Sequence, residues 1–439
     1  MSDVIKVILY EWLERKLPEI IPRELDIGRF SEDFTNKILV ITGFRRVGKT
    51  YLGLDYLNTM ASRFNRKQVV YINFEDERIP LETEFLSELL PAIIDAFNTQ
   101  PVILLLDEIH QIPGWSKWLR RLHETTDIRF IVTGSNSKMG TSEIPTELRG
   151  RYIEKHLSPL NFREYLRFRE ARFDLKNIKY KKLDLLRLQS LLDEYLQKGG
   201  LPEVVLSGEE MKNEITQSYF KTMVSRDIAE RYQVRKITAL RALLKLMLNS
   251  KLTTLTKLHN SLKSMGINIS KNTISEYLQM VEDVYFFKFV TCFSYNVKDE
   301  LQLPRKSYIV DAAFLKYVSP RLTRDTGWLY EIAVAHQLEV CGFNFNYWKA
   351  RQQDYEIDFV VRDELKVNKL IQVCSDLDDQ YTLQREIRSL LTGSQELNCR
   401  ELLIINQSLE KKESYEWFSY KAEIEFIPLW KWLLQEVRL

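Results

Sequence analysis

A short glycine-bearing stretch constrains this chain more than any other part of it. Residues 37–50 read Lys-Ile-Leu-Val-Ile-Thr-Gly-Phe-Arg-Arg-Val-Gly-Lys-Thr, which contains the pattern G-x-x-x-x-G-K-[ST]. The apolar, partly β-branched run at 38–41 predicts a strand covered on both faces, and residues 51–60 predict a helix. Between a strand and a helix, this pattern predicts a phosphate-binding loop rather than a turn with an exposed lysine.

Each position of the loop has an expected task. Gly43 lets the chain turn back, and Gly48 keeps Cβ atoms away so that backbone N–H groups converge on phosphate oxygens. Lys49 is expected to reach the β- and γ-phosphates, and the Thr50 hydroxyl is expected to hold Mg²⁺. The predicted nucleotide-binding residues are Gly43, Arg45, Arg46, Val47, Gly48, Lys49, Thr50 and Tyr51.

Two further apolar runs, at 68–76 and 101–107, predict strands that end in polar side chains. The second run ends in the adjacent carboxylates Asp107 and Glu108. In P-loop ATPases such a pair divides its work, and we assign Asp107 to Mg²⁺ and Glu108 to the base that takes a proton from the attacking water. The co-occurrence of this pair with the loop argues against a merely solvated acidic turn.

A third predicted strand, at 128–133, ends in Gly134, Ser135, Asn136 and Ser137. Ligands of open parallel sheets gather at the carboxyl ends of the strands, so these side chains are expected beside the phosphate loop. Ser135 or Asn136 is placed to bond the γ-phosphate or the attacking water. Strands alternating with helices predict an α/β fold with the doubly wound parallel sheet of a P-loop NTPase.

These motifs, with Leu148-Arg-Gly-Arg151 and the run Leu-Ser-Pro-Leu-Asn-Phe-Arg-Glu-Tyr at 157–165, resemble a large family of archaeal and bacterial AAA-type ATPases. The resemblance covers about residues 37–407. It implies a cytoplasmic ATPase of the additional-strand class, whose core precedes a winged helix and a nuclease-like domain. The expected divisions are an N-terminal helical segment (1–36), the P-loop ATPase core (37–165), a helical lid or connector (166–234), the winged helix (235–307) and a degenerate PD-(D/E)xK nuclease-like domain (308–439).

The Leu148–Arg151 element supplies two cations beyond the third strand. A fixed guanidinium can stabilise the charge on a transferring phosphoryl group, in cis or from a neighbouring subunit. Arg149 or Arg151 is expected to serve in this way, and we favour Arg151. A purely structural role for the pair stays open.

Residues 240–290 predict three helices and a hairpin, which together make a helix-turn-helix with a wing. Between 235 and 290 there are nine basic and three acidic side chains, a net charge of +6 against +2 for the whole chain. Such a module can lay its third helix in the major groove of double-stranded DNA. The outer face of that helix would carry Lys271, Asn272, Ser275 and Gln279. Packing against protein is the alternative.

The C-terminal region carries part of a PD-(D/E)xK pattern, in which carboxylates hold a metal that activates water. Glu331 on a predicted helix and Asp358 at the start of a strand match its first two parts. Gln372 replaces the next acid, and Cys374 stands where the lysine belongs. We therefore expect a degenerate site of Glu331, Asp358 and Gln372, with a binding or regulatory role preferred over DNA cleavage.

The composition limits the cellular compartments and the classes of partner that we expect for this chain. No apolar run approaches the roughly 18 to 20 residues needed to span a bilayer, so no membrane partner is expected. The four cysteines lack C-x-x-C spacing, which favours a reduced, cytoplasmic compartment without a zinc site. The leading hypothesis is an Mg²⁺-dependent ATPase whose ATP binding and hydrolysis change the arrangement of the winged helix and the nuclease-like domain. Its expected partners are double-stranded DNA, a protein or a second copy of the chain. The alternatives are an ATP-switched regulatory or defence signalling protein with little turnover, and an ATP-coupled DNA nuclease.

Overall fold

The computed structural model describes residues 2–17, 19–28, 37–135, 148, 150–294, 303–319, 325–351 and 353–435. The chain divides into two units, and each is described by itself. The first comprises residues 1–158 and 283–285, and the second comprises residues 159–282 and 286–439. Within the described ranges, no helix has both the length and the apolar character needed to cross a bilayer.

A parallel sheet of five strands forms the centre of the first unit, in the order β2-β3-β4-β1-β5. Strand β4 lies between β1, which leads into the loop, and β3, which ends in Asp107. The predicted α/β parallel sheet is thus confirmed. Strand β5 was not predicted, because its half-buried sequence Tyr-Ile-Glu-Lys-His has little apolar character. The strands are β1 (Ile38–Thr42), β2 (Val69–Asn73), β3 (Ile103–Asp107), β4 (Arg129–Gly134) and β5 (Tyr152–His156).

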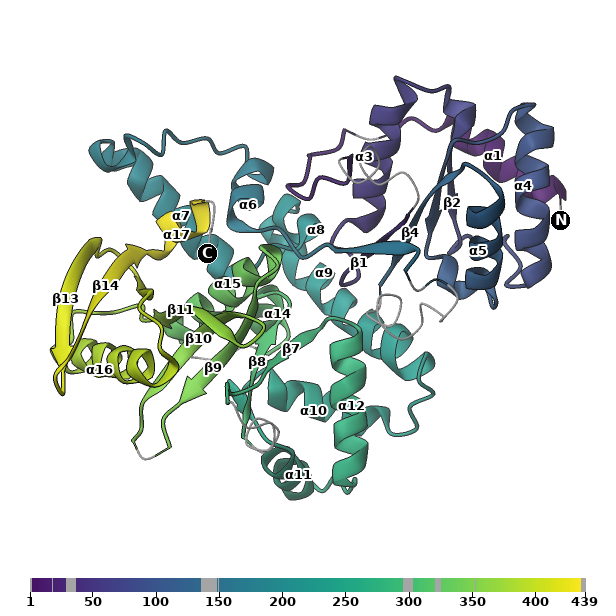
Figure 1. Cartoon of the computed structure of the whole chain (residues 1–439). Coiled ribbons are helices and arrows are strands. Elements are labelled where there is room, and N and C mark those ends of the chain that lie inside the picture. Colours follow the sequence, from purple (N-terminus) through teal and green to yellow (C-terminus); the bar gives the residue numbers. More distant parts are fainter. Residues whose placement is uncertain are drawn as a thin grey trace. The chain divides into compact units, whose positions relative to one another are not determined.

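Helices cover both faces of this sheet (Figure 1). Alternate strand residues, such as Val40 and Leu104, share one apolar core with α1, α4 and α5. Helix α3 lies against the opposite face, where a Cβ on Gly53 would come within 2.7 Å of the Leu105 side chain. The glycine therefore sets how closely the helix that follows the phosphate loop can approach the sheet. These helices are α1 (Ser2–Glu14), α3 (Lys49–Ala61), α4 (Thr83–Phe97) and α5 (Trp115–Thr125), with short 3₁₀ turns η1 (Arg66–Gln68) and η2 (Ile109–Gln111).

The second unit opens with a run of helices. Its first helix has a reciprocal cap, since the Asn161 side chain accepts from the Glu164 N–H at 2.9 Å and the Glu164 carboxylate accepts from the Asn161 N–H at 3.1 Å. This cap explains the Asn-Phe-Arg-Glu motif in structural terms. The run comprises α6 (Phe162–Phe168), the 3₁₀ turn η5 (Ile178–Tyr180), α7 (Lys182–Lys198), α8 (Pro202–Leu206), α9 (Glu209–Thr222) and the π-helical η6 (Met223–Glu230).

The Gly199-Gly200 pair between α7 and α8 closes around a buried carboxylate. Gly199 has a φ of +77°, and a Cβ there would overlap the Asp311 carboxylate. The Gly200 N–H donates to Asp311 Oδ2 at 2.6 Å, and the Ala313 N–H donates to Oδ1 at 2.9 Å. Burial raises the pKa of Asp311 to about 7, although these backbone donors act to lower it.

A module of three helices and a three-stranded antiparallel sheet follows. Strand β8 lies between β6 and β7 and pairs antiparallel with both. The Ser270 hydroxyl caps the third helix by accepting from the Thr273 N–H at 3.1 Å. Strand β8 runs across the border predicted between residues 307 and 308. In chain order the elements are α10 (Ile237–Met247), β6 (Leu252–Thr253), α11 (Leu255–Ser264), α12 (Lys271–Asp283), β7 (Phe287–Val290) and β8 (Arg305–Ile309).

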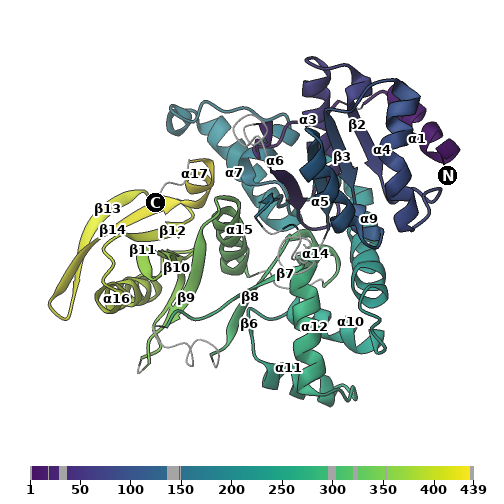
Figure 2. The same ribbon diagram turned by 45° about the vertical axis from the view of Figure 1, so that its right-hand side comes forward.

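A mixed six-stranded sheet, in the order β13-β14-β12-β11-β10-β9, forms the C-terminal part of the second unit (Figure 2). Leucines and isoleucines of α16 pack on it in one apolar core. Helix α15 precedes the sheet and contacts β8, β9 and β11. The elements are α14 (Ala313–Tyr317), α15 (Thr326–Val340), β9 (Asn344–Lys349), β10 (Glu356–Asp363), β11 (Lys366–Val373), α16 (Gln380–Leu397), β12 (Leu402–Asn406), β13 (Lys411–Trp417), β14 (Tyr420–Pro428) and α17 (Leu429–Leu434).

Candidate functional site

The predicted phosphate loop joins β1 to α3 in a conformation that depends on positive φ angles. Gly43 has a φ of +145°, and a Cβ there would collide with the Leu157 carbonyl. Arg46 and Gly48 have φ values of +69° and +99°. Left-handed residues in such a loop turn successive N–H groups toward one concave side, which suits phosphate oxygens. The site residues predicted at Gly43 and Gly48 are therefore placed where backbone geometry requires glycine.

Lys49 and Thr50 begin α3 beside the carboxyl end of β3. The buried Lys49 ammonium donates to the carbonyls of Gly43 at 3.0 Å and Phe44 at 3.1 Å. The Thr50 hydroxyl donates to Asp107 Oδ2 at 2.8 Å. The loop and the acidic strand end, 57 residues apart in sequence, thus meet through this bond.

Asp107 is a buried carboxylate surrounded by hydroxyl donors. Besides Thr50, the Tyr71 hydroxyl donates to Oδ2 at 3.1 Å, and the Thr133 hydroxyl donates to Oδ1. Burial raises the pKa of Asp107 above its ordinary value, the adjacent Glu108 charge adds to this, and the three hydroxyls act in the opposite direction. A cation at this position would relieve the desolvated negative charge.

Thr50 and Asp107 fit the Mg²⁺ that a P-loop fold implies. Both present oxygen, the ligand type this ion prefers, and they lie within hydrogen-bonding distance of each other. In nucleotide sites, Mg²⁺ is usually held by one or two protein ligands, with water and phosphate completing its shell. Two protein oxygens at the end of β3 meet that requirement.

Glu108 follows β3 in a left-handed conformation, with a φ of +56°. Its N–H donates to the Thr133 hydroxyl at 3.1 Å, which fixes the peptide that carries the side chain. Glu108 Oε1 lies 4.0 Å from Lys49 Nζ, and Oε2 lies 3.4 Å from His110 Nδ1. The carboxylate is therefore held at the loop without a close bond to the lysine.

The other predicted residues of the first unit lie in different settings. Arg45 pairs with Glu75 at 3.0 Å, and the Tyr51 side chain is exposed. Arg151 pairs with Glu124 of α5 at 2.8 Å. Ser135 is buried at the end of β4. Asn136 and Arg149 lie outside the described residues.

Three contributors to this site were missed from the sequence. Arg23 donates to the carbonyls of Val47 at 2.7 Å and Ser158 at 2.8 Å, and so ties the loop to the segment after β5. Tyr71 and Thr133 both bond Asp107. The polar end of the third predicted strand already pointed to Thr133, whereas nothing in the sequence around Arg23 marks it.

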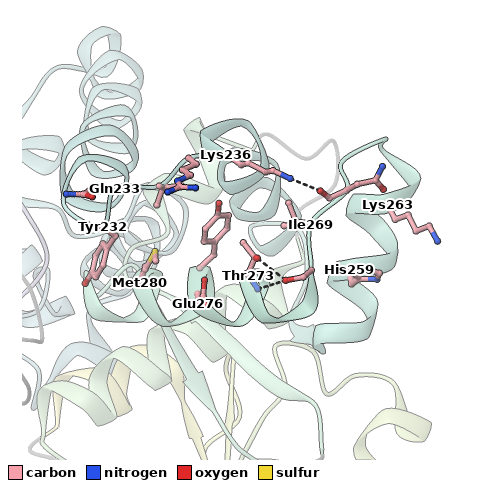
Figure 3. A pocket seen from close by; sticks show the side chains of 14 residues that line it. Tyr232, Gln233, Lys236, His259, Lys263, Ile269, Thr273, Glu276 and Met280 are labelled. Carbon is pink, nitrogen blue, oxygen red and sulfur yellow. Dashed lines mark hydrogen bonds between the residues drawn. The ribbon is translucent and has the colours of Figure 1, made fainter.

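The third helix of the middle module has two distinct faces. Lys271, Asn272, Ser275 and Gln279 are all exposed, as predicted for its outer face. A cavity of about 800 Å³ lies against other residues of α12, including Thr273 and Glu276, and Figure 3 shows its lining. Lys236 spans part of this cavity, donating to the Asn268 carbonyl at 3.0 Å.

The three residues of the degenerate nuclease pattern come together in the second unit. Gln372 Oε1 accepts from the Asp358 N–H at 3.3 Å, and Asp358 Oδ2 accepts from the Val373 N–H at 2.9 Å. Glu331 lies near Asp358 because both approach the Lys306 ammonium of β8. Cys374 follows β11, and burial raises the pKa of its thiol to about 11, so it is neutral and supplies no cation.

The segment that contains the phosphate loop and Asp107 matches a known protein family. Residues 35–166 match a family model described as an AAA domain, and residues 189–325 match one described as a domain of unknown function (DUF8612). The second match spans the connector and most of the middle module. An AAA domain is a P-loop nucleotide-binding fold, in agreement with the sheet and the loop.

Two relatives align over nearly the whole chain. The protein named Uncharacterized protein MJ1544, from Methanocaldococcus jannaschii, is 32% identical over 98% of this chain and 94% of its own length. A Haemophilus influenzae protein is 27% identical over 91% of this chain and 95% of its own length. The solved Walker-type ATPase of Pyrococcus abyssi covers 69% of this chain and 99% of its own, at 13% identity and a TM-score of 0.41. The chain therefore belongs to the family of the Methanocaldococcus jannaschii protein, as a member with an AAA-type ATPase domain.

Proposed function

We propose that the protein is an Mg²⁺-dependent ATPase whose reaction takes place at the loop between β1 and α3. One observation carries the proposal: Lys49, Thr50, Asp107 and Glu108 meet at one edge of a parallel sheet, within a segment that matches an AAA domain. Each of the four has the chemistry that phosphoryl transfer from ATP to water requires.

The proposed reaction uses these side chains in fixed roles. Lys49 turns from the Gly43 and Phe44 carbonyls to the β- and γ-phosphates and stabilises their charge. Glu108 accepts a proton from the attacking water while the oxygen of that water forms a bond to the γ-phosphorus. The bond from that phosphorus to the bridging oxygen breaks, which leaves ADP and inorganic phosphate. Mg²⁺ held by Thr50 and Asp107 would neutralise charge on the phosphates.

The test is ATP turnover by the purified full chain, with Lys49→Ala and a matched Lys67→Ala control. Lys67 is an exposed lysine of the same unit, so its loss should leave turnover unchanged. We expect steady release of phosphate by the wild-type protein and the Lys67 variant, and none by the Lys49 variant. A wild-type chain that binds ATP but releases no phosphate would instead be an ATP-driven switch.

The sequence led us to favour Arg151 as the cation of phosphoryl transfer. We now propose instead that Arg149 supplies this cation and that Arg151 has a structural role. The ion pair of Arg151 with Glu124 supports the second assignment, because it engages the guanidinium on the surface of α5. A chain in which Arg149→Ala leaves turnover at saturating ATP unchanged would contradict the first.

A second proposal concerns the middle module. We propose that this module is a winged helix. Its order of α10, β6, α11, α12, β7 and β8, with β8 between the other two strands, supports the proposal. We infer that it binds double-stranded DNA through the exposed face of α12, with the basic charge of residues 235–290 providing affinity. Packing against a protein partner is the competing role.

The full chain should bind a duplex with an affinity that falls steeply with salt, because phosphate contacts release counterions. Changing Lys271→Glu and Gln279→Glu together should weaken binding at least tenfold, whereas Lys366→Glu, an exposed lysine at the start of β11, should not. Absence of salt-dependent binding would favour protein packing. ATP turnover that rises with DNA would connect the two proposals.

A further inference from the structure

A buried lysine sits among the carboxylates of the nuclease-like pattern. Lys306 of β8 donates to Asp358 Oδ1 at 2.7 Å, and its Nζ lies 2.8 Å from Glu356 Oε1 and 3.5 Å from Glu331 Oε2. An ammonium group has three N–H donors, and three carboxylates surround this one. The site therefore already contains a cation, delivered by the chain itself.

The opposite charges in this cluster come from different parts of the second unit. The two lysines, Lys306 and Lys251, belong to the sheet of the middle module, on β8 and just before β6. The carboxylates come from α15 and β10 of the C-terminal part. Lys251 extends the pattern at the rim, 2.9 Å from Asp325 Oδ2 and 3.4 Å from Glu331 Oε1.

With Lys306 in place, the donor set does not fit a bound metal. Asp358 Oδ1 accepts from Lys306 and its Oδ2 accepts from the Val373 N–H, while the Gln372 amide oxygen accepts from the Asp358 N–H. Both Glu331 oxygens face cationic or hydroxyl groups, since Oε2 also accepts from the Tyr308 hydroxyl at 3.4 Å.

Electrostatics favour the ammonium in this position. Burial alone lowers the pKa of Lys306, but the charges of Asp358, Glu331 and Glu356 raise it well above its ordinary value. A metal at this point would have to displace a lysine that its neighbours hold charged.

We propose that Lys306 is a built-in cation that occupies the metal position of the C-terminal carboxylate site and joins β8 to α15 and β10. The domain is then closed to metal-dependent cleavage of nucleic acid. Its carboxylates act as one half of an ionic joint between the middle module and the C-terminal sheet. The ionic joint does not depend on the proposed ATPase activity, and it can be tested in the absence of nucleotide.

A competing interpretation is that Lys306 replaces the lysine missing at Cys374 and works beside a metal. A lysine that stabilises charge on a substrate phosphate needs donors that are not already held by carboxylates. Lys306 instead bonds Asp358 Oδ1 at 2.7 Å, and its Nζ lies 2.8 Å from Glu356 Oε1. Lys306 also uses its donors on the very oxygens that a metal would need, so the joint is the better assignment.

The test is Mn²⁺ binding, followed by electron paramagnetic resonance on the full chain without nucleotide. The variants are Lys306→Ala, Asp358→Asn and the combination of the two. We expect the wild type and Asp358→Asn to bind no ion at this site. Lys306→Ala should gain one Mn²⁺ that the double variant loses. Wild-type binding that Asp358→Asn removes, or a folded Lys306→Ala variant that gains no ion, would overturn the proposal.

Removal of Lys306 leaves buried carboxylates unpaired, so the variant needs a stability readout as well. We expect Lys306→Met to lower the unfolding midpoint, and Asp358→Asn added to it to restore part of the loss, since one unpaired charge disappears. Two losses that simply add would contradict a shared ionic joint. Mg²⁺- or Mn²⁺-dependent DNA cleavage abolished by Asp358→Asn would contradict the closed site.

Discussion

Each unit of this chain places a buried lysine near an aspartate on a strand, and the two lysines are used in opposite ways. The Lys49 side chain is 6% exposed and the Lys306 side chain is 5% exposed, so burial does not distinguish them. Lys49 bonds two backbone carbonyls and stays 4.0 Å from Glu108. Lys306 bonds Asp358 at 2.7 Å. What differs is whether a carboxylate already neutralises the cation.

This difference indicates how a reactive site differs from a structural one. Carbonyl oxygens are neutral acceptors, and γ-phosphate oxygens can replace them with a gain in charge attraction. A buried carboxylate is a far stronger partner, and removing it from its lysine exposes an unpaired charge in both groups. The first arrangement is therefore ready for an anionic substrate, and the second resists any exchange.

The largest effect should come from Glu108, the proposed base at the first site. Glu108→Gln keeps the size of the side chain and removes its ability to accept a proton. We expect turnover to fall by about 10²–10⁴-fold, the usual contribution of general base catalysis, with ATP affinity nearly unchanged. Phosphate release and equilibrium nucleotide binding, measured on the same sample, check this. A variant that retains more than a tenth of wild-type turnover would assign the base elsewhere.

The next effect concerns the second site. Lys306→Met should lower the free energy of unfolding by about 3–5 kcal/mol, because the carboxylates around it lose their buried partner. Lys288→Met is the matched control on the same sheet, since Lys288 pairs with Glu339 at 3.2 Å but is far more exposed. That pair should be worth about 0–1 kcal/mol. Equal losses in denaturant unfolding of the two variants would contradict the distinction.

The buried Asp311 carboxylate has no lysine partner in the contacts described above, and its effect on stability should depend on pH. The Asp311 carboxylate accepts hydrogen bonds from the backbone N–H groups of Gly200 and Ala313, and burial raises its pKa to about 7. A raised acid pKa means that the folded state holds its proton more tightly than the unfolded state. Stability from this group is therefore complete below about pH 4 and is lost as the pH rises to about 7.

Asp311→Asn should remove this pH dependence. Relative to the variant, the free energy of unfolding of the wild type should fall between about pH 4 and pH 7. Above about pH 7, the difference in free energy between the two proteins should stay constant. Unfolding midpoints in urea across this range provide the measurement. A difference between the two proteins that does not change with pH would show that Asp311 keeps an ordinary pKa.

The smallest effect should come from the surface pair of Arg151 and Glu124. Both side chains are more than one-third exposed, and such pairs contribute about 0–1 kcal/mol to stability. If the role of Arg151 is structural, Arg151→Ala and Glu124→Ala should each change ATP turnover by no more than about twofold. A loss of tenfold or more in the arginine variant alone would make Arg151 part of the phosphoryl-transfer site.

The residues proposed for the nucleotide site could be predicted from the sequence, because they lie in two short segments that each have a recognisable pattern. The loop at 43–50 and the pair Asp107–Glu108 each lie in one short segment, and a strand or helix beside each segment predicts its place in a parallel sheet. Arg23 could not be predicted in this way. It reaches the loop carbonyls from a separate segment, and no local pattern distinguishes it from other arginines.

The second site shows the same limit more strongly. The sequence alone shows a thiol at Cys374 in place of a lysine, because Gln372 and Cys374 lie in one short segment, and burial raises the pKa of that thiol. The cation in the site comes instead from β8, in a different sheet and 52 residues before Asp358. Only the packing of the middle module against the C-terminal part brings them together, and no spacing rule contains that information.

The most direct test of the contrast between the two lysines is the number of Mn²⁺ ions bound per chain with a non-hydrolysable ATP analogue present. We predict one ion, lost in Asp107→Asn and retained in Asp358→Asn, because the carboxylate of the second site already holds Lys306. Two ions per chain, with the second lost in Asp358→Asn, would contradict the view that one site is ready for substrate while the other is closed by its own lysine.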